Sequence, residues 1–276
     1  MEPYVLILLI IICFMVSLFG SVVGFGGGIF MVPILITAFH FNLATAVGAV
    51  MISLIPSSLL STYLNRKSGN VDFKMGILLE IPTMIGVVIG SLLLSYISAK
   101  RLELLFATMV FLLGLSFFIK FKKTENTQGG LFYKMNKLKP RFIIKNKSHF
   151  VAYRVSLWMV SFFGLLAGSL AGLFGIGGGF LKTPIMIKVF KMPVKIATAT
   201  ALFMIVITST TGSISHYFQG NIDIQKAWPI ILGFTLGALA GQKINLKANP
   251  KLIENLIGIG LIVAAGIMVF NLIFNH

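Results

Sequence analysis

Two clusters of glycine, each inside a long apolar run, constrain the fold of this chain more than any other feature. The first reads GFGGG at residues 24–28, and the second reads GIGGG at residues 175–179. Each is followed, five residues after its last glycine, by a proline, Pro33 or Pro184. Glycine inside a helix costs about 0.8 to 1 kcal/mol relative to alanine. Both clusters therefore predict a break in a helix that something other than helix stability must explain.

Composition places these breaks in a lipid bilayer. The chain is 57% hydrophobic and 11% charged, with a mean hydropathy of +0.97, whereas about a quarter of the residues are charged in a soluble domain. The net charge of +16 would suit a nucleic-acid partner. We exclude one, because the basic residues lie in short gaps between apolar runs and in one central linker, as the positive-inside bias of membrane proteins requires.

Several apolar runs are long enough to cross a membrane. In the first half, residues 4–23, 44–64, 75–97 and 102–119 each approach the roughly 20 residues that a crossing needs. Residues 29–41 and 180–190, which follow the glycine clusters, are shorter and either cross or are re-entrant. Non-helical backbone at membrane depth is tolerated only where it is buried in protein or lines a polar cavity. The glycine clusters therefore predict a polar site inside the membrane.

A basic linker divides the chain into two related halves. Residues 120–154 contain ten Lys or Arg and one acid, Glu125. On either side, positions 151 residues apart match without a gap over about 100 residues, so that GNVD at 69–72 corresponds to GNID at 220–223. We predict a first transmembrane repeat at residues 1–119, a cytoplasmic linker at 120–154 and a second transmembrane repeat, the product of internal duplication, at 155–276.

Loop charge predicts that the second repeat is upside down. The gap around His40 has no Lys or Arg, whereas the matching gap has Lys188, Lys191 and Lys195. Basic residues favour the cytoplasmic side, so matched loops lie on opposite sides and each half has five crossings. We predict an all-α, multi-pass protein of the cell membrane with two inverted-topology repeats, short or broken helices at the glycine clusters, and both termini outside. Such repeats are common in secondary transporters.

The pattern G-x-G-G-G-(x)4-P in both halves, on two apolar repeats joined by a hydrophilic linker, resembles the TauE/SafE sulfite exporter family. The resemblance covers nearly the whole chain outside the linker. It implies transport of sulfite, organosulfonates and related small sulfur-containing anions, and its name favours export. The residues themselves identify neither the anion, the direction, the coupling ion nor the oligomeric state.

An anion at membrane depth needs several converging donors, because removing it from water costs several kcal/mol. Successive glycines allow backbone N–H groups to form a nest, and the helices that follow point their positive ends at the same place. We predict that the anion contacts both glycine clusters and three hydroxyls. These residues are Gly24, Gly26, Gly27, Gly28, Gly175, Gly177, Gly178, Gly179, Thr183, Ser57 and Thr208. The alternative is that the glycines only let helices cross closely.

Two charged residues lie inside predicted apolar segments. Lys182 follows Gly179 by three positions, so its ammonium would reach an anion held at the first helical turn. The alternatives are that Lys182 snorkels to an interface or pairs with a loop acid. A lysine in the bilayer costs about 2.5 to 3.5 kcal/mol on insertion scales. Glu80 is a candidate for coupling protonation to anion movement, and its alternatives are a pair with Lys74 or an interfacial position.

Four other polar residues lie near predicted span ends. Asp72 and Asp223 precede apolar runs and are predicted to cap the following helices. Arg66 and His216 are predicted to be solvated or interfacial rather than in contact with substrate.

These features favour a secondary transporter that works by alternating access. An anion channel is the first alternative, although it would not need an inverted duplication. A membrane-embedded enzyme is disfavoured, because the spans lack His-Glu-x-x-His, paired carboxylates and a Cys-His set. No ATP-binding motif, metal site or cofactor is predicted, and a dinucleotide fingerprint is excluded because Ile29 and Phe180 stand where its third glycine would be.

Overall fold

The computed structural model describes residues 3–94, 140–146 and 151–274, together with scattered positions between 96 and 118. Most of the predicted crossing at 102–119 and most of the linker lie outside the described residues. The first half contains α1 (Pro3–Val23), α2 (Gly28–Phe39), α3 (Leu43–Lys67) and α4 (Phe73–Leu93). The second half contains α7 (Leu157–Phe174), α8 (Gly179–Lys188), α9 (Val194–Phe218), α10 (Ile224–Lys247) and α11 (Pro250–Phe274).

Six helices of the described residues are long and apolar enough to cross a membrane. They are α1, α3, α4, α7, α9 and the Pro250–Ile267 part of α11. By contrast, α2 has 12 residues and α8 has 10. At 1.5 Å per residue these two helices are about 15 to 18 Å long, roughly half of the 30 Å hydrocarbon core. The protein is therefore a multi-pass helical membrane protein in which the helices after the glycine clusters are short.

The acidic residues that precede α4 and α10 cap those helices, as predicted. An Asp72 carboxylate oxygen accepts a hydrogen bond from the Met75 amide at 3.0 Å. Asp223 accepts one from the Gln225 amide, also at 3.0 Å. The caps satisfy amides that would otherwise lack a partner in the first helical turn.

Small residues let the helices of one half pack closely against those of the other. The helix α4 lies along α7, and α1 lies along α10. A Cβ added at Gly86 of α4 would lie 2.8 Å from the Ser169 amide nitrogen, and one at Gly237 of α10 would lie 2.9 Å from the Leu18 amide nitrogen. Gly86 corresponds to Gly237, and Leu18 to Ser169, in the 151-residue repeat. The same contact is therefore made twice, with the halves exchanged.

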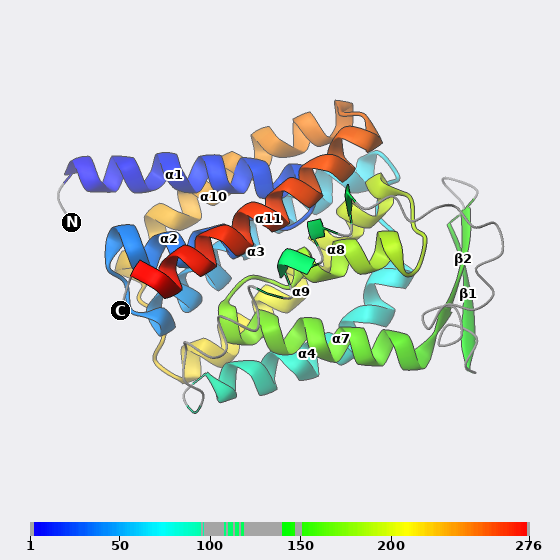
Figure 1. The fold of residues 1–276 in the computed structure, drawn as a ribbon, viewed down its shortest axis with the longest axis horizontal. Helices are drawn as coiled ribbons and strands as arrows, with labels where there is room; N and C mark the ends of the chain where they lie inside the picture. The colour runs from blue at the N-terminus through cyan, green and yellow to red at the C-terminus, as the bar shows by residue number, and fades with distance from the viewer. Residues whose placement is uncertain are drawn as a thin grey trace.

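The two ends of the elongated molecule differ in what they carry (Figure 1). The helix α1 begins and α11 ends at one end, and a β-hairpin lies at the opposite end. The second hairpin strand ends at Ser156 and α7 begins at Leu157. As a result, α1 and α7 enter the helical bundle from opposite ends.

The hairpin is a departure from the predicted all-α fold. Its strands β1 (Arg141–Asn146) and β2 (Val151–Ser156) pair antiparallel, with Phe142 opposite Val155. Both strands are rich in β-branched and aromatic residues, which favour extended backbone, although basic residues are interspersed among them. The hydroxyl of Tyr153 donates a hydrogen bond to the Asp72 carboxylate. The hairpin therefore contacts the start of α4.

Candidate functional site

Both glycine clusters form turns whose backbone favours glycine. In each cluster the first three of the four glycines have positive φ: 81°, 76° and 99° at Gly24, Gly26 and Gly27, and 67°, 65° and 71° at Gly175, Gly177 and Gly178. A residue with a Cβ pays about 1 to 2 kcal/mol in this left-handed region. The turns end α1 and α7 and start α2 and α8, so the predicted helix breaks are present in both halves.

The two turns touch each other in the interior. A Cβ added at Gly28 would lie 2.8 Å from the Cα of Ile176, and one at Gly179 would lie 3.2 Å from the Cα of Phe25. Phe25 and Ile176 are equivalent residues of the two halves, and both are buried. Sequence positions about 150 residues apart are thus brought into direct backbone contact.

Two apolar side chains lie against both turns. Added Cβ atoms at Gly26 and Gly177 would lie 2.9 and 3.0 Å from methyl groups of Leu54, and both would also meet Ile205. Leu54 and Ile205 are fully buried. The Gly26 amide donates to the Gly20 carbonyl at 3.1 Å, so it is not a free donor in this conformation. Leu54 and Ile205 were not predicted from the sequence. They occupy equivalent positions of the two halves, and this equivalence is the signal in the sequence that points to them.

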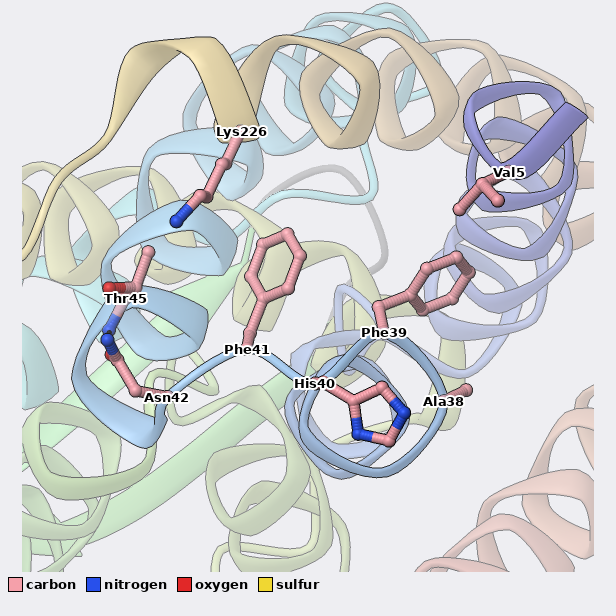
Figure 2. Close-up of a pocket in the computed structure, with 8 residues that line it drawn as sticks. All are labelled: Val5, Ala38, Phe39, His40, Phe41, Asn42, Thr45 and Lys226. Atoms are coloured by element: carbon pink, nitrogen blue, oxygen red, sulfur yellow. Dashed lines mark hydrogen bonds between the residues drawn. The ribbon is translucent and has the colours of Figure 1, made fainter. Parts of the chain in front are cut away.

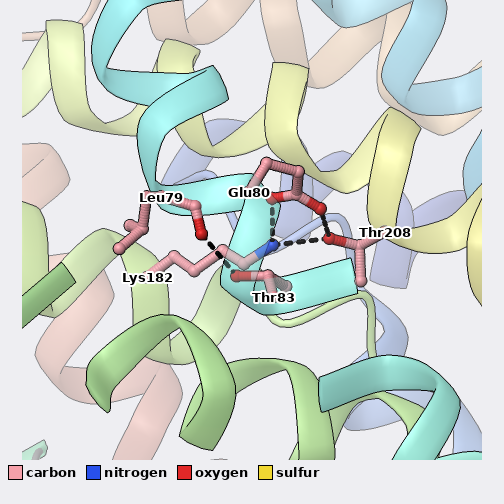
Figure 3. Close-up of polar contacts among 5 residues, drawn as sticks. All are labelled: Leu79, Glu80, Thr83, Lys182 and Thr208. Atoms are coloured by element: carbon pink, nitrogen blue, oxygen red, sulfur yellow. Dashed lines mark hydrogen bonds and ion pairs between the residues drawn. The ribbon is translucent and has the colours of Figure 1, made fainter. Parts of the chain in front are cut away.

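Lys182, Glu80 and Thr208 form a buried polar network beside the second turn (Figure 3). The Lys182 ammonium lies 2.8 Å from Glu80 Oε2 and 2.5 Å from Thr208 Oγ1, and the Thr208 hydroxyl donates to the other carboxylate oxygen. The side chains of Lys182 and Glu80 are 0% and 2% exposed. A Cβ added at Gly178 would lie 3.2 Å from Lys182 Cε. The lysine therefore runs directly along the glycine turn.

This geometry decides between alternatives that the sequence left open. Lys182 neither snorkels nor pairs with a loop acid, because its partner is the intramembrane Glu80. Glu80 is correspondingly not paired with Lys74 and is not interfacial. Removing one partner of a buried ion pair typically costs about 3 to 5 kcal/mol, because the other charge is left uncompensated. Each of these charges therefore depends on the other for its place in the interior.

The other predicted hydroxyl groups make different contacts. Thr183 donates to the Gly24 carbonyl at 3.1 Å, which links α8 to the first glycine turn. Ser57 donates to the Ser53 carbonyl of its own helix, also at 3.1 Å. Thr183 thus joins the glycine turns, whereas Ser57 hydrogen-bonds back to α3.

One of the predicted span-end residues lies in the interior. His216 is fully buried; one ring nitrogen lies 3.1 Å from the Gly172 carbonyl oxygen and the other lies 3.2 Å from the side-chain nitrogen Nδ2 of Asn221. The prediction that His216 is solvated is wrong, because α9 packs this residue against α7. Arg66 is exposed, as predicted.

A separate, open pocket lies at the junction of α2 and α3 (Figure 2). It has a volume of about 520 Å³ and shares no residue with the buried network. His40 and Lys226 bring basic side chains to its rim, and the Lys226 ammonium lies 5.9 Å from the centre of the Phe41 ring. Among the residues that the structure describes, no group of three His, Cys, Asp or Glu residues is placed to hold a metal ion.

Comparison with known proteins identifies the family. The family model described as Sulfite exporter TauE/SafE matches residues 9–268. The chain is 29% identical to the "Probable membrane transporter protein YunE" of Bacillus subtilis, over 98% of this chain and 99% of the relative. It is also 29% identical to the "Probable membrane transporter protein MJ0441" of Methanocaldococcus jannaschii, over 88% of each.

A shorter match links the chain to a plant protein. The "Sulfite exporter TauE/SafE family protein 3" of Arabidopsis thaliana is 30% identical over 32% of this chain and 18% of the relative. No solved structure matches the chain. The family match spans nearly all of the sequence, including both glycine turns and the buried network. The chain therefore belongs to the TauE/SafE sulfite exporter family and is a membrane transporter, not an enzyme.

Proposed function

We propose that this transporter carries small sulfur-containing anions, such as sulfite or organosulfonates, by alternating access. The anion is held between the two glycine turns and the ammonium of Lys182. The family description names sulfite, which supports the choice of substrate class.

One observation carries the proposal most directly. Two matched turns of left-handed glycine backbone meet in the interior, and a buried ammonium runs along one of them. Backbone amides in such turns form nests for anions, and the N-termini of α2 and α8 add their positive ends. The anion-binding residues that we propose are Gly24, Gly26, Gly27, Gly28, Gly175, Gly177, Gly178, Gly179, Lys182, Thr183, Ser57 and Thr208.

Alternating access follows from an inverted repeat. The exchanged contacts of Gly86 and Gly237 support a two-fold relation between the halves, and the opposite entry of α1 and α7 supports inversion (Figure 1). With the basic linker in the cytoplasm, both termini lie outside. Rocking of one half against the other would then open the glycine turns to each side in turn.

Leu54 and Ile205 close the proposed site in the present conformation. Both side chains lie against Gly26 and Gly177 and are fully buried. Binding of an anion at the turns requires these side chains to move aside and the Gly26 amide to leave the Gly20 carbonyl. In the described conformation these two side chains therefore stand in the way of an anion at the turns.

Uptake into proteoliposomes tests the proposal. Sulfite, thiosulfate, sulfate and small sulfonates are offered to the purified protein, and we expect saturable uptake of at least one sulfur-containing anion. Lys182→Arg should keep part of this uptake and Lys182→Gln should lose it, because only arginine retains the charge. Lys188→Gln is the matched control, since Lys188 lies on the same helix but is partly exposed and pairs with Glu254. Equal uptake by the two Lys182 variants would contradict direct contact with the anion.

The same vesicles distinguish a carrier from a channel. A carrier exposes its single site first to one side of the membrane and then to the other, and in doing so it exchanges labelled for unlabelled anion. Counterflow should therefore exceed net uptake. Ionic currents at single-channel rates, without counterflow, would instead support the anion channel.

A further inference from the structure

The buried network contains a balanced pair of opposite charges. Of the ion pairs among the described residues, Lys182–Glu80 is buried, whereas the Lys188–Glu254 and Lys226–Asp223 pairs are partly exposed. The empty site is thus electrically neutral as long as Glu80 is ionised and Lys182 is protonated. Any anion that enters changes this balance.

No other described group faces Glu80 to restore the balance. The helix α7, which packs along α4, has no titratable residue. On α9, the Lys195 ammonium donates to the Leu246 carbonyl and the His216 ring is bound to Gly172. On α4 itself, Lys74 is exposed. Lys182 is therefore the cation available to Glu80 within the described structure.

An anion and Glu80 compete for the same ammonium. An anion on the second glycine turn lies beside Gly178, along which the Lys182 side chain runs. If Glu80 stayed ionised, two negative charges would share one lysine in a desolvated site, and this strongly favours protonation of one of them. A buried charge without a partner is the costly alternative.

We infer that Glu80 takes up one proton from solvent for each anion that binds, so that the protein is a proton–anion symporter. The inference rests on the proposed function. The proton adds to a carboxylate oxygen of Glu80, and the resulting acid is neutral. The Lys182 ammonium then pairs with the anion instead of with Glu80. The empty site has one positive and one negative charge, and the site with a bound monoanion and neutral Glu80 has the same balance.

Thr208 is the positioning residue in this exchange. Its hydroxyl accepts from the Lys182 ammonium and donates to the Glu80 carboxylate, and it can also accept from the neutral acid once Glu80 is protonated. It therefore keeps a partner for the neutral acid after Lys182 has moved to the anion. The coupling also makes direction depend on the proton gradient, and an inward gradient drives uptake in contrast to the export that the family name suggests.

The test measures anion and proton fluxes together in the wild-type protein. Proteoliposomes contain a pH-sensitive dye, the membrane potential is clamped at zero, and the anion is the sulfonate or sulfite that the uptake panel identifies. We expect one proton per monoanion and, with one pH unit across the membrane, about tenfold accumulation. Anion flux without proton flux would overturn the symport inference but leave the proposed function standing. No flux of any sulfur-containing anion would overturn both.

The variant Glu80→Gln sharpens the result. Its amide resembles the protonated acid, so counterflow of anion should be retained, although reduced because Lys182 loses its partner, while gradient-driven accumulation and proton flux disappear. Glu254→Gln is the control, because it also changes an acid in an ion pair to an amide but at a partly exposed position; it should keep proton coupling. Accumulation by Glu80→Gln equal to that of the wild type would show that another group carries the proton.

Discussion

The two glycine turns have nearly the same backbone but different surroundings. In the second half, Lys182 and Thr208 join Glu80 in a buried polar network. The equivalents of Lys182 and Thr208 in the first half are Met31 and Ser57, and the equivalent of Glu80 in the second half is Ile231. There the Cys13 thiol lies 3.7 Å from the Met31 sulfur, and Ser57 bonds to its own helix.

The two turns share their backbone conformation but differ in the side chains around them. Both halves retain the left-handed glycines and the reciprocal contacts of Gly28 and Gly179. The charged pair of Lys182 and Glu80 lies beside the second turn, whereas Met31 and Ile231 occupy the equivalent positions. The backbone of the two turns therefore accounts for the architecture of the site, and the side chains around the second turn account for its electrostatics.

Replacing the charged pair beside the second turn by its equivalents in the other half should have the largest effect. Lys182→Met leaves Glu80 buried without a cation, and we expect a loss of about 3 to 5 kcal/mol in the free energy of unfolding together with loss of transport. Thermal unfolding in detergent and uptake by proteoliposomes check both. The double variant Lys182→Met/Glu80→Ile should recover most of the stability but no transport, because well-packed apolar residues replace a buried pair at little cost. Full transport by Lys182→Met would remove the functional difference between the halves.

Changes at Thr208 should have an intermediate effect. Thr208→Val keeps the shape but removes the hydroxyl, and a buried partner left without its hydrogen bond costs about 1 to 3 kcal/mol. Thr208→Ser, which copies Ser57, keeps the hydroxyl and loses only a methyl group worth about 0.8 kcal/mol. Unfolding midpoints should therefore rank wild type, then serine, then valine. A serine variant less stable than the valine variant would mean that packing, not hydrogen bonding, is the role of Thr208.

Alanine in the two turns should cost less stability than Lys182→Met and should distinguish the two turns. Gly27→Ala and Gly178→Ala each place a Cβ in left-handed backbone, at about 1 to 2 kcal/mol. The Cβ at Gly27 would also lie 3.0 Å from the Val16 carbonyl oxygen, whereas the Cβ at Gly178 would meet the Lys182 side chain. We expect Gly27→Ala to lose more stability than Gly178→Ala. For the same loss of stability, we expect Gly178→Ala to lose more transport.

A third glycine provides the control for this pair. Gly220 also has a positive φ of 73°, but an added Cβ would meet nothing within 4 Å. Gly220→Ala should therefore show the backbone cost alone and keep transport. If Gly178→Ala reduced transport no more than Gly220→Ala does, contact between the second turn and Lys182 would not matter for transport.

Much of the fold could be predicted because it depends on local pattern. Apolar runs located most of the long helices, the acids before α4 and α10 located the caps, and glycine clusters located the breaks. The hairpin was missed although its residues favour strands. The candidate site was predicted less completely, because the partner of Lys182 lies 102 residues away and no spacing in the sequence connects Glu80 to it.

The sequence by itself determined that this is a duplicated membrane protein with glycine turns in both halves, since hydrophobicity, repetition and the backbone freedom of glycine are properties of residues and their neighbours. Only the tertiary structure decided that the turns meet, that Leu54 and Ile205 lie against them, that His216 is buried, and that Lys182 and Glu80 neutralise each other. The physical reason is desolvation. A charge in the interior takes whichever opposite charge the packing of the helices brings to it, and that packing is a property of the whole chain.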